Sequence, residues 1–243
     1  MAWFFSDTTI EGGTYLIRGE DAKHIEKSLR MRVGEELTLI TPLKEQCRCA
    51  VTGFTPEGVE VEVKEKCACV QEADIEVTLY QSLTKGDKMD LIVQKSVELG
   101  VHRIVPVITE RCVSRPDEKS LRKKTERWQK IALGAAQQSC RGMVPEVSDA
   151  MKFDEALKDA SQKDTSVIFY EGGGESLKSF TENDSKSFGV FVGCEGGFDV
   201  AEVEKAKSAG VCPATLGKRI LRAETAPLAA LSAIMCLTGN FDL

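Results

Sequence analysis

Residues 191–199 read FVGCEGGFD, and this stretch decides the fold. The apolar run Gly189–Val192 indicates a short strand, and Asp199–Ala209 has helical spacing and opens with a capping box of Asp199 and Glu202. The three glycines between strand and helix let the backbone approach a ligand closely. A strand, a glycine-rich loop and a helix in this order are typical of parallel α/β sheets, which bind ligands at the carboxyl ends of their strands.

Glu195 lies inside this loop and limits the kind of ligand that fits. Its carboxylate would repel a phosphate, whereas an amine or a sulfonium cation would be attracted. The spacing also differs from the G-x-G-x-x-G fingerprint of dinucleotide sites, so a nucleotide-dependent oxidoreductase fits poorly. The loop taken alone is equally compatible with a tight structural turn.

Working outward from the loop, strand and helix patterns alternate from residue 75 onward. The predicted strands are Ile75–Gln81, Ile104–Ile108, Val167–Tyr170 and Gly189–Val192. The predicted helices are Asp87–Leu99, Asp117–Ser139 and Asp199–Ala209. This alternation predicts an α/β domain with a mostly parallel sheet covered on both faces.

The first seventy residues have a different pattern, typical of a small β-rich module. The predicted strands are Glu36–Thr41, Gln46–Phe54 and Val59–Lys64. One helix is predicted at Asp21–Arg30, with Asp21 as its N-cap. We place the domain boundary near residue 72, which gives predicted domains of residues 1–72 and 73–243.

Composition indicates an ordinary globular protein of 243 residues, 42% hydrophobic and 29% charged. The N-terminus lacks a basic signal-peptide region, and the longest apolar stretch, Ala226–Leu237, is too short to span a bilayer. We therefore expect a cytoplasmic protein without membrane contact, whose nine cysteines are reduced thiols. Structural zinc sites favour C-x2-C spacing, so the C-x-C pairs at residues 47–49 and 67–69 are expected to be metal-free.

The net charge of −6 is unevenly distributed along the chain. Residues 81–145 carry 13 basic and 7 acidic side chains, whereas the segments on either side are net acidic. A locally basic segment can bind a polyanion even in an acidic protein, because fields at physiological salt act over short range. A solvated helix face explains the same charges, and charge alone favours that simpler interpretation.

A second informative segment, residues 216–227, reads LGKRILRAETAP. It places a glycine, arginines, a glutamate and an apolar pair directly before a helix, and Pro227 falls in the first turn of that helix, where proline is tolerated. The helix, Ala226–Leu237, is apolar almost all round. Such a helix must be covered on every side, either within its domain or in a subunit interface.

Together these two segments resemble the SPOUT superfamily of methyltransferases, and more closely its RsmE-type family, which methylates N3 of a uridine in small-subunit ribosomal RNA. The resemblance covers nearly the whole chain. It includes LRMRVG at 29–34, QKSVELGV at 94–101, ERC at 110–112 and WQKIA at 128–132. It implies a SPOUT-type parallel sheet with a C-terminal trefoil knot, and a small N-terminal PUA-like β-barrel.

Three positions depart from the family pattern. The family loop usually reads G-P-E-G-G-F, so Cys194 replaces its proline. Lys218 stands where proline is common, and Met143 stands where a basic residue is often found. The first two changes loosen the loops but keep Glu195 and the glycines, and the third weakens one expected RNA contact.

The resemblance implies that S-adenosylmethionine binds mainly to backbone groups of the two segments. The implied cofactor residues are Tyr170, Glu171, Val192, Gly193, Glu195, Gly196, Leu216, Gly217, Ile220, Leu221 and Thr225. Arg222 and Glu224 are expected near the reacting base, where a guanidinium stabilises negative charge on the uracil oxygens and a carboxylate accepts the N3 proton or orients Arg222. An acid that stabilises the helix N-terminus is the alternative role for Glu224.

The resemblance also implies the partners. The expected RNA contacts are Arg30, Arg32, Lys95 and Arg141. The expected partners are 16S ribosomal RNA or the small ribosomal subunit and a second copy of the chain, with neither DNA nor a membrane. Methylation of another RNA or of a ribose 2′-hydroxyl, and a non-catalytic RNA-binding assembly factor, stay open as alternatives.

Overall fold

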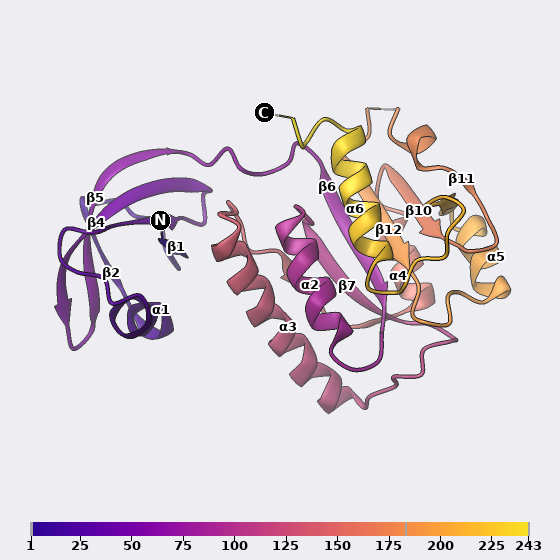
Figure 1. Ribbon diagram of the computed structural model, residues 1–243, viewed down its shortest axis with the longest axis horizontal. Helices are drawn as coiled ribbons and strands as arrows, with labels where there is room; N and C mark the ends of the chain where they lie inside the picture. Colours follow the sequence, from indigo (N-terminus) through magenta and orange to yellow (C-terminus); the bar gives the residue numbers. More distant parts are fainter. Residues whose placement is uncertain (1, 183, 243) are drawn as a thin grey trace. The chain divides into compact units, whose positions relative to one another are not determined.

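The computed structural model describes residues 2–182 and 184–242, which form two compact units (Figure 1). One unit comprises residues 1–72 with 136–144, and the other comprises residues 73–135 with 145–243. The segment 136–144 groups with the N-terminal residues although it follows most of a long helix of the second unit. A single cut of the chain therefore does not describe both units.

The first unit is a five-stranded sheet in the order β1-β3-β4-β5-β2. Its strands are β1 (Ala2–Phe5), β2 (Thr14–Ile17), β3 (Glu36–Ile40), β4 (Glu45–Thr55) and β5 (Gly58–Ala68). Only β1 and β3 pair in parallel, and the other pairs are antiparallel. The helix α1 (Gly19–Lys23) continues as the π-helical turn η1 (His24–Ser28), so the predicted N-cap at Asp21 is wrong and Arg18 holds that place.

Three cysteines of the C-x-C pairs lie on the two long strands β4 and β5, and Cys69 directly follows β5. Cys47 and Cys49 share one face of β4 and are fully buried, as residues two apart on a strand should be. Cys67 is exposed and Cys69 is half-buried. Within residues 2–182 and 184–242, no cluster of three or more His, Cys, Asp or Glu side chains is placed to hold a metal ion.

The second unit confirms the predicted parallel α/β sheet. Its strand order is β11-β13-β10-β12-β6-β7-β8, with β9 added beside β7, and every pair is parallel. The strands are β6 (Glu76–Ser82), β7 (Arg103–Ile108), β8 (Glu146–Val147), β9 (Met151–Lys152), β10 (Thr165–Phe169), β11 (Glu175–Ser176), β12 (Ser187–Val192) and β13 (Cys212–Thr215).

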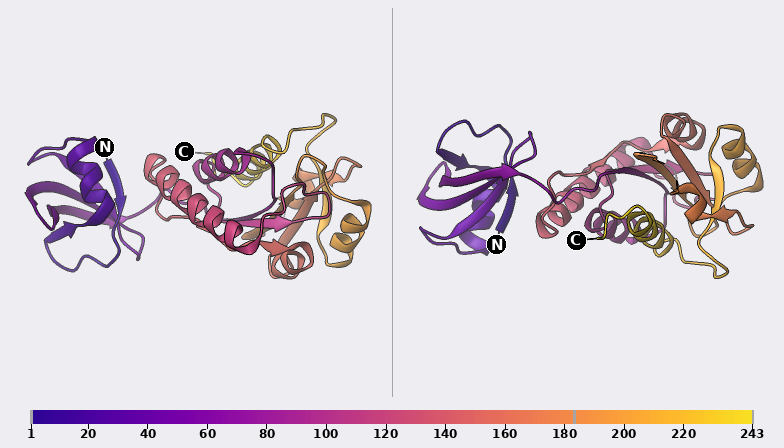
Figure 2. Two further views of the ribbon diagram at one scale, coloured as in Figure 1. Left: turned by 90° about the horizontal axis from the view of Figure 1, so that it is seen from below. Right: turned by 90° about the horizontal axis from the view of Figure 1, so that it is seen from above.

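Helices cover both faces of this sheet. They are α2 (Lys88–Glu98), α3 (Glu118–Gln138), α4 (Phe153–Ala160), the short 3-10 helix η2 (Leu177–Phe180), α5 (Val200–Ser208) and α6 (Ala226–Leu237). Figure 2 shows α2 and α6 on one face and α4 and α5 on the other. The capping box predicted at Asp199 and Glu202 is present at the start of α5. In the described part of the chain, no helix has the length and apolar character that a membrane crossing requires.

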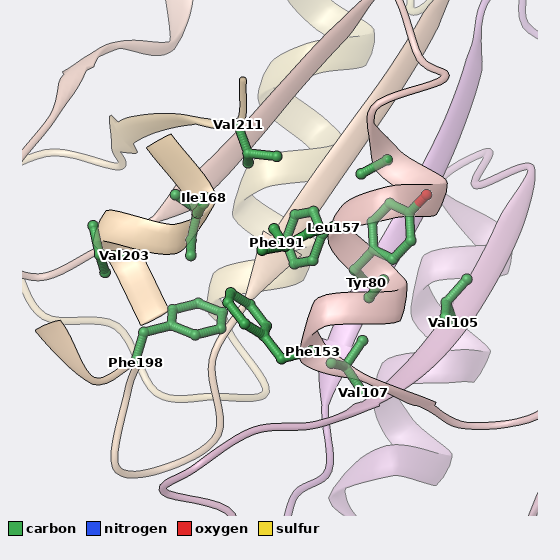
Figure 3. Close-up of a cluster of buried hydrophobic side chains, with 13 residues drawn as sticks. Tyr80, Val105, Val107, Phe153, Leu157, Ile168, Phe191, Phe198, Val203 and Val211 are labelled. Carbon is green, nitrogen blue, oxygen red and sulfur yellow. The ribbon is translucent and has the colours of Figure 1, made fainter. Parts of the chain in front are cut away.

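Aromatic packing fixes the strand that leads into the glycine-rich loop (Figure 3). Phe191 of β12 stacks on Tyr80 of β6 with ring centroids 4.4 Å apart, and Phe153 of α4 meets Phe191 edge-on at 5.9 Å. Phe198, just after the loop, is also fully buried in this cluster. Burying each such side chain contributes about 1.5–3 kcal/mol, so both ends of the loop are firmly anchored.

Candidate functional site

The loop of residues 193–197 turns back on itself directly after β12. The backbone N–H of Gly197 donates to the carbonyl of Cys194 at 3.0 Å. Gly197 has a φ of 66°, and a Cβ on it would lie 2.4 Å from Oε2 of Glu171. The Glu171 carboxylate ends a flexible side chain that can move aside, so the positive φ is the main reason that this turn favours glycine.

Two side chains from neighbouring strand ends hold the loop in place. The buried amide of Gln81, on β6, donates to the carbonyls of Val192 and Gly193 at 3.4 and 3.3 Å. Arg111, after β7, donates to the carbonyl of Gly196 at 3.0 Å and to Asp199 at 3.3 Å. The sequence interpretation did not include either side chain in the site, although residues 110–112 carried part of the family resemblance.

A cavity of about 430 Å³ opens where β10, β12 and β13 end. These strands are adjacent and parallel, so their carboxyl ends share one edge of the sheet. The structure brings nine of the predicted cofactor residues into the cavity wall: Tyr170, Glu171, Val192, Gly193, Glu195, Leu216, Gly217, Ile220 and Leu221. Two predicted residues lie outside the wall: Gly196 is held by Arg111, and Thr225 is the N-cap of α6.

Lys88, the first residue of α2, lies in the cavity wall between two carboxylates. Its ammonium is 2.9 Å from Oε1 of Glu195 and 3.3 Å from Oε2 of Glu224. The hydrogen bond to Glu195 is the main reason that the pKa of Lys88 is raised. Burial raises the pKa of Glu195, but the bonds from Lys88 and from the backbone N–H groups of Glu195 and Lys85 outweigh it, so the net pKa is lowered.

Arg222 and Glu224 are brought together on the segment between β13 and α6. Arg222 lines the cavity with its side chain 85% exposed, and its Nη1 lies 4.0 Å from Oε1 of Glu224. Glu224 itself is largely buried, at 19% exposure. Its own backbone N–H and then Lys88 lower the pKa of Glu224, so this carboxylate is ionised near neutral pH.

The loop also rests on a pair of thiols that sequence reasoning did not connect. Cys194, which stands where the family loop has proline, lines the cavity and is hydrogen-bonded to the buried thiol of Cys112. This bond, together with the contact of Cys112 with Thr109 at 3.1 Å, lowers the pKa of Cys112 to about 6, whereas the pKa of Cys194 is raised.

Three of the predicted RNA-contacting residues are accessible. Arg30 and Arg32 are exposed on the turn after η1, and Arg30 has a φ of 53°, which is uncommon for a residue with a side chain. Lys95, on α2, is 40% exposed and lies 2.7 Å from Glu98. These positions leave all three side chains accessible to solvent.

The contact predicted for Arg141 is not supported. Its side chain is 5% exposed, and its guanidinium binds the carboxylate of Glu72 through Nε at 2.8 Å and Nη2 at 2.6 Å. The N–H of Gly142 adds a third bond to Glu72, and the indole of Trp3 donates to the carbonyl of Arg141 at 2.9 Å. Arg141 therefore ties residues 136–144 to the N-terminal sheet, and its charge is already neutralised.

Comparisons with known proteins agree with this geometry. The profile of a family described as "RNA methyltransferase domain" matches residues 71–235, and that of "RNA methyltransferase PUA domain" matches residues 17–64. A Bacillus subtilis protein named "Ribosomal RNA small subunit methyltransferase E" is 36% identical over 231 residues, covering 92% of this chain and 90% of the relative.

Two solved structures are similar over nearly the whole chain. The Neisseria gonorrhoeae ribosomal RNA small subunit methyltransferase E bound to S-adenosyl methionine has a TM-score of 0.90 and 35% identity, covering 99% of each chain. A putative methyltransferase from Legionella pneumophila in complex with the same cofactor has a TM-score of 0.89 and 28% identity, covering 97% of each chain. The resemblance seen in residues 191–199 and 216–227 is thereby confirmed.

Proposed function

Because the chain belongs to the RNA methyltransferase family, we propose that it transfers the methyl group of S-adenosylmethionine to N3 of a uridine in 16S ribosomal RNA of the small subunit. One observation carries this proposal: a single cavity gathers the glycine-rich loop with Glu195 and the Arg222 segment. The names of the relatives and the cofactor of the two similar structures support the substrate and the cofactor.

The residues of the cavity fit S-adenosylmethionine, which supplies an electrophilic methyl group on a sulfonium. Glu195 lines the cavity with a carboxylate that Lys88 pairs with, and the close approach at Gly193 and Gly197 leaves backbone groups facing the cavity. Ile220, 87% exposed, and Leu221 offer apolar surface for an adenine ring. The other proposed cofactor residues are Tyr170, Glu171, Val192, Gly196, Leu216, Gly217 and Thr225.

We propose Arg222 as the group that stabilises the uridine anion. N3 of uridine is a poor nucleophile until its proton leaves, and the resulting charge spreads onto O2 and O4, where a guanidinium can bind it. The exposed guanidinium in the cavity wall is available for this contact. The lowered pKa of Glu224 makes it a weak proton acceptor, which favours a role in orienting Arg222.

We propose that residues 1–72, with which residues 136–144 group, form the RNA-binding module and the remainder of residues 73–243 the methyltransferase domain, with Arg30, Arg32 and Lys95 contacting RNA phosphates. Their accessible side chains support this, and such contacts position RNA without reading its sequence. An RNA substrate of this kind supports the expected cytoplasmic location.

We also propose a homodimer and a C-terminal knot. The helix α6 buries Pro227, Ala230, Leu231, Ile234 and Met235, but its opposite face is only partly covered, and Leu237 is 42% exposed. A half-covered apolar helix is typical of a subunit interface. Sedimentation at micromolar concentration should give a dimer, and a cofactor-binding monomer would overturn this part of the proposal. The knot is what the family resemblance of residues 191–199 and 216–227 implies.

The decisive test is to map the methylated nucleoside. Ribosomal RNA from a deletion strain, with and without complementation, is compared by primer extension and nucleoside mass mapping. Loss and return of one N3-methyluridine in 16S RNA is the expected result. A ribose methyl group or a different RNA would favour the alternative methyltransferases, and no change in methylation would favour an assembly factor.

A further inference from the structure

Lys88 occupies an unusual place for a cation. It is the first residue of α2, where the unpaired backbone N–H groups and the helix dipole disfavour positive charge. Its side chain is 35% exposed and its ammonium is directed at two carboxylates from different loops. Because the helix alone does not explain a lysine here, the two carboxylates must provide its stabilisation.

Glu224 depends on this lysine. Oε2 of Glu224 is buried and has no hydrogen bond to any residue that the structure describes, so the ion pair with Lys88 compensates its charge. The second oxygen, Oε1, faces Nη1 of Arg222 at 4.0 Å. Holding one oxygen on Lys88 therefore turns the other toward Arg222.

Glu195 is also held by Lys88, and by the backbone just before α2. Its Oε1 lies 2.9 Å from the ammonium of Lys88 and accepts a hydrogen bond from the backbone N–H of Lys85 at 3.2 Å. Two carboxylates that share one cation would repel each other without it. The ammonium thus joins the loop after β12 to the segment before α6, two walls of one cavity.

We propose that Lys88 is a positioning residue for methyl transfer, which holds Glu195 of the glycine-rich loop and Glu224 together so that Glu224 presents Arg222 to the base. This inference rests on the proposed function and assigns Lys88 no contact with the substrate. Misplacing a reacting group by about 1 Å lowers rates roughly a hundredfold, so a positioning residue has a large effect on turnover.

The test compares Lys88→Met and Lys88→Arg with the wild type in single-turnover methylation across a pH series. Lys88→Met should slow transfer at least about tenfold while S-adenosylmethionine affinity, measured by calorimetry, falls much less. Lys88 lowers the pKa of Glu195 and Glu224, so its loss should move the acid limb of the rate profile to higher pH. Lys88→Arg keeps the charge and should recover most of the rate.

Two controls separate positioning from general charge or folding effects. Lys85→Met removes an equal charge three residues away, leaves the backbone N–H on Glu195, and should not shift the acid limb. In a Glu224→Gln background, Lys88→Met should cost less than in the wild type, because the contact with Glu224 is already weakened and only the contact of Lys88 with Glu195 is newly lost. Thermal melts verify that each variant is folded.

Equal losses from Lys88→Met in the wild-type and Glu224→Gln backgrounds, an unmoved acid limb, or near-normal turnover would each overturn the role of Lys88. A wild-type protein that does not methylate 16S RNA would instead overturn the proposed function. The two failures are therefore distinguishable in one set of measurements.

Discussion

Each unit of the protein contains an arginine paired with a glutamate, and the two pairs are built in opposite ways. Arg141 is buried and donates hydrogen bonds to both carboxylate oxygens of Glu72, at 2.6 and 2.8 Å. Arg222 is 85% exposed and approaches one oxygen of Glu224 at 4.0 Å. A two-point buried pair fixes structure, whereas a loose pair at a cavity wall leaves donors free for a substrate.

The contrast shows why residue type and motif alone do not assign a role. The sequence interpretation placed both arginines in functional positions because both lie in segments that resemble the family. Their burial distinguishes the two roles, because a buried guanidinium that is already paired with a carboxylate is not available to bind RNA. The contrast can be tested with changes in each unit.

The largest expected effect comes from Arg141→Met. Removing one partner of a buried pair leaves the other charge uncompensated and should lower the free energy of unfolding by about 3–5 kcal/mol. Denaturant unfolding of the full chain measures this. Arg222→Met should lower the free energy of unfolding much less. Equal losses in the two variants would contradict the assignment of a structural role to Arg141 and not to Arg222.

The same pair predicts a pH dependence. Burial raises the pKa of Glu72, but the bonds from Arg141 and the N–H of Gly142 outweigh it, and its net pKa is lowered on folding. The stabilisation is therefore present above the pKa of an unfolded glutamate and is lost as pH falls through the folded value. Arg141→Met should lose stability less steeply on acidification than the wild type.

The second largest effect is expected for Arg222→Ala in single-turnover methylation. Removing a donor that acts on transition-state charge lowers the rate roughly a hundredfold or more, while fold and cofactor affinity stay unchanged. Arg222→Lys should recover only part, and higher pH should partly rescue Arg222→Ala because the uridine anion forms more easily. If melting temperature and cofactor affinity fall in step with activity, Arg222 is a structural residue like Arg141.

A smaller effect is expected from Gly197→Ala, which tests the loop beside Arg222. Its Cβ would displace the end of the flexible Glu171 side chain, a proposed cofactor residue, from its place 2.4 Å away, so cofactor affinity by calorimetry should fall severalfold. Gly210→Ala is the matched control, because Gly210 has a φ of 82° but open space around its Cβ. The control should lose about 1–2 kcal/mol of stability and keep cofactor affinity. Equal losses of cofactor affinity in Gly197→Ala and Gly210→Ala would show that the contact between residue 197 and Glu171 does not matter for binding.

The smallest effect is expected for Arg30→Ala in the first unit. Loss of one phosphate contact should weaken RNA binding severalfold and reduce the salt slope of the affinity by about one, with cofactor affinity unchanged. Lys64→Ala removes an exposed charge from β5 of the same unit and should leave the slope unchanged. Identical slopes for Arg30→Ala and the wild type would show that exposure of Arg30 has no part in RNA binding.

Local patterns predicted much of the fold and most of the cavity. The alternating periodicity gave β6, α2, β7, α3, β12, α5 and α6 close to their observed bounds, and the glycines around Glu195 marked the loop. The four-residue strands β1, β2 and β13 were missed because none of them is a continuous buried apolar run like Gly189–Val192. The helix α4 was missed although its apolar residues face one side of the helix.

Long-range partners were the part that the sequence could not supply. Lys88 lies more than a hundred residues from Glu195, and a lysine at the start of a helix has no local pattern that names its partner. Arg141 and Glu72 are 69 residues apart, and their burial depends on packing of the whole unit. Only the fold brings such pairs together.

The cavity wall has a consequence for the order in which the protein is made. Residues 215–226 close a wall whose other members, from Lys88 to Gly197, are all synthesised before them. A nascent chain therefore has a nearly complete sheet while its cofactor site is still open, and ligand binding can stabilise only chains that have passed this segment. Cofactor supply should thus protect finished molecules from proteolysis and leave stalled ones unprotected.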